Sequence, residues 1–231
     1  MMYATLILLR HGQSVYNQEN LFTGWTDVEL SEQGRQEAKK AAAELKTLKL
    51  YPDICYTSWL KRAIHTGQIV LAEMVWEHID CIKSWKLNER HYGTWQKRNK
   101  DVVKQEVGDE AFLSVRRGYD TPPPPLEEND PRAVKFDLKY KDLDPALLPK
   151  SESLKDTHTR VKEYYRDVLI PELAKGKTVL VSAHGNSLRA LVMEIERLST
   201  DAVVKLEIPT GMPLIYRYDE GLKIIEKVKN D

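Results

Sequence analysis

The sequence has only two cysteines among its 231 residues, Cys55 and Cys81, and they form no CxxC pair. A disulfide framework and a cysteine-based zinc site are therefore not expected, and both thiols are expected to lie in the core. No hydrophobic run approaches the roughly 20 residues that a membrane-spanning helix needs. The N-terminus also lacks the basic region of a signal peptide. These absences predict a cytoplasmic protein without a membrane partner.

An excess of charge is absent as well, because 35 Lys and Arg residues balance 35 Asp and Glu residues. This balance disfavours a nucleic-acid partner, which selects basic proteins. The six histidines show neither HxxxH nor HExxH spacing, so no metal is expected. A metal site built from His11, His65, His91 and His184 is the weaker alternative.

Short apolar runs alternate with amphipathic segments, which predicts one α/β domain over residues 1–231. Its central sheet is expected to be mostly parallel, with helices on both faces. The predicted strands cover 3–9, 53–58, 78–85 and 178–183, followed by a hairpin of 212–218 and 222–228. The predicted helices cover 32–48, with Ser31 as its N-cap, and 59–75, 100–117, 154–173 and 187–198.

A proline-rich stretch interrupts this pattern at residues 118–150, with prolines at 122–125, 131, 145 and 149. The stretch is too rich in proline for regular structure and too long for a tight connection. It also contains large apolar side chains such as Phe136 and Tyr140. We therefore expect an ordered insertion in preference to a disordered linker.

Two strands of the predicted sheet end in the same way. LILLRHGQS at 6–14 and VLVSAHGNS at 179–187 both run from apolar residues into His-Gly, one further residue and Ser. Ligands of open α/β sheets bind beyond the carboxyl ends of the strands. If the two strands are neighbours, His11 and His184 meet there. Each loop also leads into a predicted helix N-terminus, which favours an anion.

The arginines near these motifs indicate that the anion is a phosphate. Arg10 precedes His11, and Arg62 begins the helix after the second strand. A guanidinium group matches phosphate oxygens with two parallel hydrogen bonds. Nearby positive charge lowers the pKa of a histidine and leaves a neutral imidazole as a nucleophile. The alternative is that both histidines are structural, since a single RHG triplet is a weak signal.

Eight segments together resemble the cofactor-dependent phosphoglycerate mutases of the histidine phosphatase superfamily. The resemblance spans about residues 3–218, and its most specific parts are FTGWTDVELSEQG (22–34) and LNERHYG (87–93). The other segments are LLRHGQSVYNQENL (8–21), TSWLKRAIHT (57–66), RRGYDTPPPP (116–125), SLKDTHTRV (153–161), AHGNSLRALV (183–192) and IPTGMPLIY (208–216).

The resemblance implies an enzyme of glycolysis and gluconeogenesis that interconverts 3-phosphoglycerate and 2-phosphoglycerate. It further implies a 2,3-bisphosphoglycerate primer, no metal, and a homodimer or homotetramer. His11 matches the nucleophile, Glu89 the proton donor and acceptor, and His184 the residue that stabilises the transferring phosphoryl group. The phosphate cradle matches Arg10, Ser14, Asn17, Arg62, Gly185 and Asn186. The groups that hold the glycerate and its second charged end match Thr23, Gly24, Arg90, Tyr92, Lys100, Arg116 and Arg117.

Serine at position 14 resembles the pattern of the glycolytic mutases, whereas the related bisphosphoglycerate mutases have glycine at this position. Three departures from the family pattern remain. The loop from Thr94 to Arg98 carries Trp95, Lys97 and Arg98 where relatives have small or apolar residues. Val115 replaces a tryptophan, and the segment IEKVKND (225–231) stands where relatives carry a tyrosine-rich tail.

These departures lead to expectations that the structure can test. Trp95 is expected to cover the site in place of the tail, and Lys97 and Arg98 to add positive charge beside the substrate. Because such a cover is incomplete, we expect some 2,3-bisphosphoglycerate phosphatase activity beside the mutase activity. A histidine-type phosphatase and a weakly active phospholigand-binding protein are the alternative functions.

Overall fold

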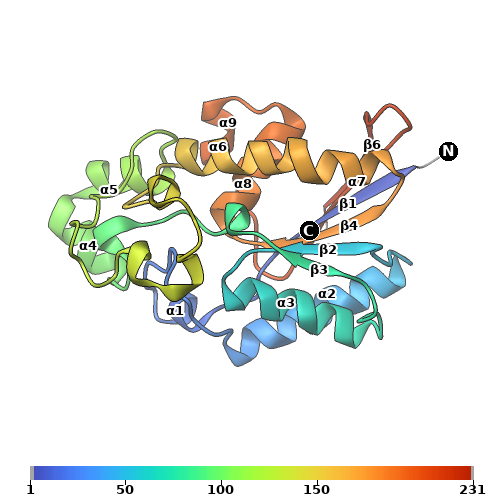
Figure 1. Cartoon of the computed structure of the whole chain (residues 1–231), viewed down its shortest axis with the longest axis horizontal. Helices are drawn as coiled ribbons and strands as arrows, with labels where there is room; N and C mark the ends of the chain where they lie inside the picture. The colour runs from blue at the N-terminus through green and yellow to red at the C-terminus, as the bar shows by residue number, and fades with distance from the viewer. Residues whose placement is uncertain (1–2, 230–231) are drawn as a thin grey trace.

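Six strands form one sheet in the order β3-β2-β4-β1-β5-β6 (Figure 1). The computed structural model describes residues 3–229. Strands β1 to β4 are parallel, β5 runs antiparallel to β1, and β6 runs antiparallel to β5. The strands are β1 (Ala4–Arg10), β2 (Ile54–Thr57), β3 (Cys81–Lys83), β4 (Thr178–Ala183), β5 (Pro213–Tyr218) and β6 (Ile224–Lys229). The predicted mostly parallel sheet is thereby confirmed.

Both faces of the sheet are covered because β1 is apolar on both sides. Leu6 and Leu8 belong to the core on one face, whereas Ile7 and Leu9 belong to the core on the other. Helices α2 (Glu32–Thr47) and α3 (Lys61–Glu73) cover the second face. The first face is covered by α6 (Leu154–Tyr164), α7 (Ile170–Ala174), α8 (Gly185–Glu196) and α9 (Thr200–Lys205) (Figure 1).

The carboxyl ends of β1 and β4 form the topological switch point of this sheet. The two strands are adjacent, with Arg10 opposite Ala183. After β1 the chain passes through α1 (Val15–Gln18) to α2, whereas after β4 it enters α8 on the opposite face. The diverging connections open a crevice between the two strand ends, where α/β proteins bind ligands.

A lobe of shorter elements lies beyond this crevice, on the left of Figure 1. It contains α4 (Lys100–Val107), α5 (Asp109–Arg117) and the proline-rich stretch, which forms short 3₁₀ turns at Val134–Phe136, Leu138–Tyr140 and Pro145–Leu147. Val134 and Tyr140 are buried against Trp25. The proline-rich stretch is therefore ordered by side-chain packing in place of regular backbone hydrogen bonding.

Several predicted boundaries differ from the structure. The predicted helix over 100–117 divides at Gly108, which has a φ of 82°. The predicted helix over 154–173 contains a π-helical turn at Tyr165–Leu169, just before Pro171, whose nitrogen carries no hydrogen to donate. The strand predicted over 78–85 shortens to β3, because within residues 3–229 it pairs with β2 alone, which has four residues. Helix α8 begins two residues earlier than expected, at Gly185.

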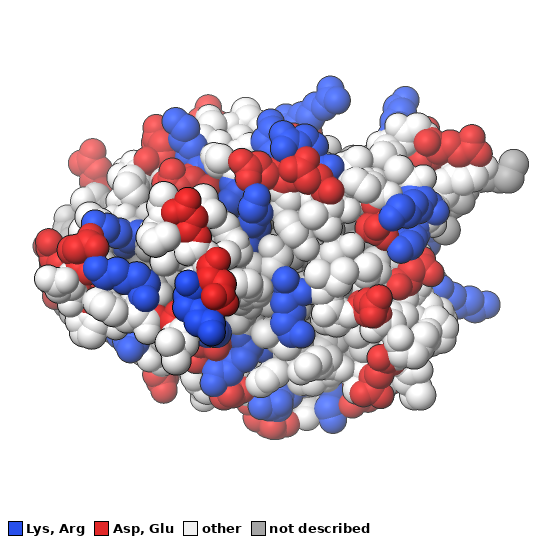
Figure 2. All heavy atoms as spheres, in the orientation of Figure 1, with Lys and Arg blue, Asp and Glu red and all other residues white. Residues whose placement is uncertain are grey.

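Charged side chains of both signs are interspersed over the face shown in Figure 2. None of the helices within residues 3–229 has the length and apolar character needed to cross a bilayer.

Candidate active site

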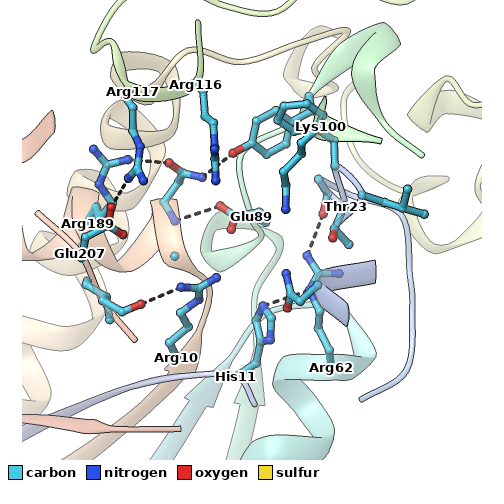
Figure 3. A pocket seen from close by; sticks show the side chains of 18 residues that line it. Arg10, His11, Thr23, Arg62, Glu89, Lys100, Arg116, Arg117, Arg189 and Glu207 are labelled. Atoms are coloured by element: carbon cyan, nitrogen blue, oxygen red, sulfur yellow. Dashed lines mark hydrogen bonds and ion pairs between the residues drawn. The ribbon is translucent and has the colours of Figure 1, made fainter. Parts of the chain in front are cut away.

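A cavity of about 160 Å³ opens at the carboxyl ends of β1 and β4 (Figure 3). Cations dominate its lining, in contrast to the mixed charges of the face in Figure 2. Its walls consist of Arg10, His11, Asn17, Leu21, Phe22, Thr23, Gly24, Arg62, Glu89, Tyr92, Lys100, Arg116, Arg117, Gly185, Asn186, Arg189, Glu207 and Ile208. Thirteen of the residues identified from the sequence are thus brought to one place by segments far apart in the chain.

His11 lies at the base of the cavity with its tautomer fixed by two hydrogen bonds. Its Nδ1 lies 2.7 Å from the carbonyl oxygen of Gly12, which can only accept, so the proton is on Nδ1. Its Nε2 accepts a hydrogen bond of 3.2 Å from the Nε–H of Arg62. Burial, together with the charges of Arg62 and Arg10, holds the pKa of His11 well below its usual value. His11 is therefore a neutral imidazole that presents the lone pair of Nε2.

Arg62 is almost fully buried at the start of α3 and is fixed by backbone carbonyl groups. Its Nη1 donates to the oxygen of Thr26 at 3.0 Å, and its Nη2 donates to that of Gly24 at 2.8 Å. Burial lowers the pKa of this guanidinium to about 10, which leaves it charged at neutral pH. The site thus holds a fixed cation next to Nε2 of His11.

Arg10 approaches His11 from the opposite side (Figure 3). Its Nη1 donates to the oxygen of Ile208 at 2.7 Å. Gly185 lies against this arginine, because a Cβ at that position would meet Cζ of Arg10 at 3.4 Å. The glycine of the second His-Gly pair therefore leaves room for the arginine of the first motif.

His184 is fully buried behind His11, and the two ring centroids are 5.0 Å apart. Its Nε2 and the Oγ of Ser58 share a hydrogen bond of 2.8 Å. Its Nδ1 has no hydrogen-bond partner among the described residues. Burial, Arg62 and His11 hold the pKa of His184 well below its usual value. The prediction that the two strand-end histidines meet is confirmed.

Glu89 projects into the middle of the cavity from an irregular loop (Figure 3). Its Oε1 accepts hydrogen bonds from the backbone N–H groups of Arg90, at 2.8 Å, and Asn186, at 3.0 Å. The second bond joins the loop to the first turn of α8. The remaining carboxylate oxygen, Oε2, is thereby left to face a ligand.

The loop that carries Glu89 is held by a buried ion pair behind the cavity. Arg160 and Glu152 are both largely buried and joined by two hydrogen bonds of 2.7 and 2.8 Å. Arg160 also donates to the carbonyl oxygens of Asn88 and Glu89, each at 2.9 Å. The indole N–H of Trp25 donates to the same oxygen of Glu89 at 2.5 Å. These contacts replace the regular hydrogen bonding that the loop lacks.

The far wall of the cavity consists of cations from three other segments. Lys100 begins α4, and Arg116 and Arg117 end α5. Burial, with Arg116 and Arg10 nearby, lowers the pKa of Lys100 to about 8. Arg117 forms an ion pair with Glu207 at the rim. This wall can hold a second negative group at a distance from His11.

Three of the predicted site residues do not line the cavity. Ser14 is buried as the N-cap of α1, where its Oγ accepts from the N–H of Asn17 at 3.2 Å. Arg90 is also buried; its Nη1 donates to the oxygen of Val115 and its guanidinium lies over the ring of Tyr92. His184 is the third, one layer behind His11. Ser14 and Arg90 thus support neighbouring lining residues and do not face the cavity.

The expectations for the loop at 94–98 were wrong. Trp95 is 3% exposed and packs against Phe22 and Phe112, away from the cavity. Lys97 lies at a separate cleft beside Trp25, and Arg98 forms an ion pair with Glu106. Trp95 is a core residue because the chain after Gly93 turns toward α4 and α5. The loop therefore adds neither cover nor charge to the cavity.

Val115 packs in the same cluster as Trp95, with Phe22, Val103 and Phe112. Residues Ile224–Val228 of β6 lie at the edge of the sheet and do not line the cavity, and Asn230 and Asp231 of the segment at 225–231 lie outside the described residues.

Sequence reasoning missed five lining residues: Leu21, Phe22, Arg189, Glu207 and Ile208. Arg189 had a detectable signal, because it lies four residues after Gly185 on the same face of α8. Its Nη1 donates to the Oδ1 of Asn186 at 3.0 Å. Glu207 and Ile208 follow α9, and no local pattern indicates that they reach the cavity.

Within residues 3–229, no three His, Cys, Asp or Glu side chains gather closely enough to hold a metal ion.

Comparison with known proteins places this geometry in a family. The model of the histidine phosphatase superfamily (branch 1) matches residues 6–136 and 132–231. A 2,3-bisphosphoglycerate-dependent phosphoglycerate mutase of Nautilia profundicola is 49% identical over 221 residues, which cover 96% of each chain. Phosphoglycerate mutase 1 of Saccharomyces cerevisiae is 49% identical over 94% of this chain and 88% of its own. The crystal structure of phosphoglycerate mutase from Bacillus anthracis has the same fold, with a TM-score of 0.68 at 21% identity over 99% of this chain and 92% of its own.

Proposed function

We propose that His11 carries the phosphoryl group in the reaction of this enzyme. The chain belongs to the histidine phosphatase superfamily and, within it, to the 2,3-bisphosphoglycerate-dependent phosphoglycerate mutases. The enzyme interconverts 3-phosphoglycerate and 2-phosphoglycerate. The observation that supports His11 most directly is its fixed neutral tautomer, with the lone pair of Nε2 between Arg62 and Arg10.

In this proposal Nε2 of His11 attacks phosphorus, and the bond from phosphorus to the departing oxygen breaks. The Nδ1–H of His11 keeps its hydrogen bond to Gly12, which stabilises the positive charge on the phosphorylated ring. The Nε–H of Arg62, which points to Nε2 in the free enzyme, turns to a phosphoryl oxygen. Arg62 and Arg10 neutralise the oxygens of a loose transition state, in which charge and alignment matter most.

The cavity fits a bisphosphorylated glycerate because its cations lie in two groups. Arg10 and Arg62 flank His11, and the second group, Lys100, Arg116 and Arg117, lies on the far wall. A molecule with a phosphate at one end and further negative groups at the other can contact both groups at once. The bisphosphoglycerate supplies the phosphoryl group that loads His11.

Glu89 moves the proton of the substrate hydroxyl. When a hydroxyl oxygen of the glycerate attacks the phosphohistidine, its proton passes to a carboxylate oxygen of Glu89, and in the reverse direction Glu89 returns it. The two backbone N–H groups on Oε1 hold the carboxylate in place during both transfers. General acid–base catalysis of this kind contributes about 10²–10⁴-fold to the rate.

His184 stabilises the phosphoryl group in transit from behind His11. In this scheme the hydroxyl of Ser58, which accepts from the N–H of Leu60, donates to Nε2 of His184, so Nδ1 carries the ring proton and can donate it. No metal takes part in this scheme, because the arginines supply the positive charge that magnesium supplies in other phosphoryl-transfer enzymes. Activity should therefore be unchanged in EDTA, and a loss that manganese or zinc restores would contradict this part.

A coupled assay for 2-phosphoglycerate formation tests the function. The expected result is activity from 3-phosphoglycerate that rises when 2,3-bisphosphoglycerate is added and is absent in His11→Ala. His78→Ala is a matched control, because this histidine lies outside the cavity. Equal activity of His11→Ala and wild type would contradict the proposal.

A further inference from the structure

The two cysteines lie opposite each other on neighbouring strands, far apart in the sequence. Cys55 on β2 is the register partner of Cys81 on β3. Neighbouring strands are about 4.8 Å apart, and a disulfide joins Cα atoms separated by about 4.4–6.8 Å. Both side chains belong to the apolar cluster on the α2–α3 face, so they point to the same side of the sheet. The backbone therefore brings the two sulfur atoms within reach of each other.

The two thiols differ in their surroundings. Cys55 is fully buried, whereas Cys81 is partly exposed on the edge strand. The Sγ–H of Cys55 donates to the carbonyl oxygen of Tyr56 at 3.9 Å. The interaction between the two thiols, with a contribution from Lys83, lowers the pKa of Cys81 to about 7. The same interaction, together with burial, raises the pKa of Cys55 well above its usual value. The accessible cysteine is thus the one whose thiolate is stabilised, as reactive cysteines require.

We propose that Cys81 and Cys55 form a reversible disulfide when the protein meets a hydroperoxide. The Cys81 thiolate attacks one peroxide oxygen, the O–O bond breaks, and Cys81 becomes a sulfenic acid as an alcohol or water leaves. The Cys55 sulfur then attacks the sulfur of Cys81, the S–O bond breaks, and the thiol proton leaves with the hydroxyl group as water. The two sulfurs supply the two electrons that reduce the peroxide.

The sulfur of Cys55 faces a glycine of α3, which has no side chain to contact it. A Cβ at Gly67 of α3 would lie 3.5 Å from the sulfur of Cys55. The disulfide would close the segment that contains α3, including Arg62 in its first turn. It would form on the α2–α3 face and not in the cavity, since neither cysteine lines the cavity.

Hydrogen peroxide added to the full-length protein tests the proposal. The expected product has lost two hydrogens, with a peptide cross-link between residues 55 and 81 by mass spectrometry and the loss of both thiols together in a thiol titration. Dithiothreitol should restore both thiols. Because the pKa of Cys81 lies below its usual value, Cys81 should react with peroxide faster at pH 7 than a free cysteine does.

Two variants separate the roles of the cysteines. Cys55→Ser should stop at a sulfenic acid on Cys81 that dimedone traps, and Cys81→Ser should leave Cys55 unmodified. Thermal melting of both variants shows that they are folded. Oxidation of wild-type Cys81 to the sulfinic acid without a cross-link would overturn the proposal, as would a disulfide between two chains through Cys81 or a thiol pair that does not react.

Discussion

Glu207 is expected to weaken substrate binding, because it places a carboxylate in a cavity built for an anion. Six cations line the cavity (Arg10, Arg62, Lys100, Arg116, Arg117 and Arg189), against two carboxylates, Glu89 and Glu207. Glu207 forms an ion pair with Arg117, so a negative group of the substrate must displace it. Glu207→Gln removes this competitor and keeps the shape of the side chain.

The exposure of the two side chains sets the magnitude of the effect. The side chain of Arg117 is 39% exposed and that of Glu207 is 66% exposed. Ion pairs of this exposed class contribute about 0.2–1 kcal/mol, which corresponds to a KM for 3-phosphoglycerate about 1.4- to 5-fold lower in Glu207→Gln. The inhibition constant of inorganic phosphate should fall in the same direction. Both effects should shrink as salt rises, because screening weakens exposed charges.

Steady-state kinetics of Glu207→Gln and Glu106→Gln together test this prediction. Glu106 pairs with Arg98 outside the cavity and has similar exposure, so its variant removes the same charge without touching the site. The KM of Glu106→Gln should equal that of wild type. A KM that is unchanged or raised in Glu207→Gln would refute the reasoning that its carboxylate competes with the substrate.

Three further predictions follow from the site and its supports. Glu89→Gln should lower mutase turnover about 10²–10⁴-fold while phosphoryl transfer from 2,3-bisphosphoglycerate to the enzyme continues; equal loss of both steps in single-turnover experiments would make Glu89 a structural residue. Trp95→Ala should lower the free energy of unfolding in urea by about 3–5 kcal/mol, because the indole is buried; a loss below about 1 kcal/mol would show that the cluster around it is loosely packed. Burial lowers the pKa values of His11, His91 and His184 in the folded state, that of His91 to about 3. Below about pH 6.5 these histidines bind protons in the unfolded chain but stay neutral in the folded chain. The free energy of unfolding should therefore be constant above about pH 6.5 and fall below it, by up to about 1.4 kcal/mol per pH unit for each histidine. Urea titrations that give the same free energy of unfolding from pH 7.5 to 5 would contradict this.

The sequence was sufficient to predict the sheet and the position of the cavity, because both depend on local patterns. Apolar runs such as 6–9 and 179–183 are too short for typical helices and predict buried strands, and parallel strands place their carboxyl ends together. The repeated His-Gly step then marked the residues that meet there. The short α1 and α9 were missed, because four and six residues show too little periodicity.

The errors concern side-chain direction and contacts made across the fold. The loop at 94–98 follows a segment of the site, but its sequence does not show that Trp95 turns away toward Phe112. Glu207 reaches the cavity only because α9 packs back against α8, which is a tertiary contact. Arg160 of α6 donates a hydrogen bond to the loop that carries Glu89. The sequence of α6 indicates an amphipathic helix but does not show this contact.

The most direct test of the central claim is the identity of the phosphorylated residue after incubation with 2,3-bisphosphoglycerate. The account predicts one phosphoryl group on His11, stable in alkali and labile in acid, identified by mass spectrometry of peptides kept at high pH. His11→Ala should remain unlabelled, whereas Glu89→Gln should still be labelled. Phosphate on Ser14 or on any other residue, or labelling that persists in His11→Ala, would contradict the claim that His11 carries the phosphoryl group.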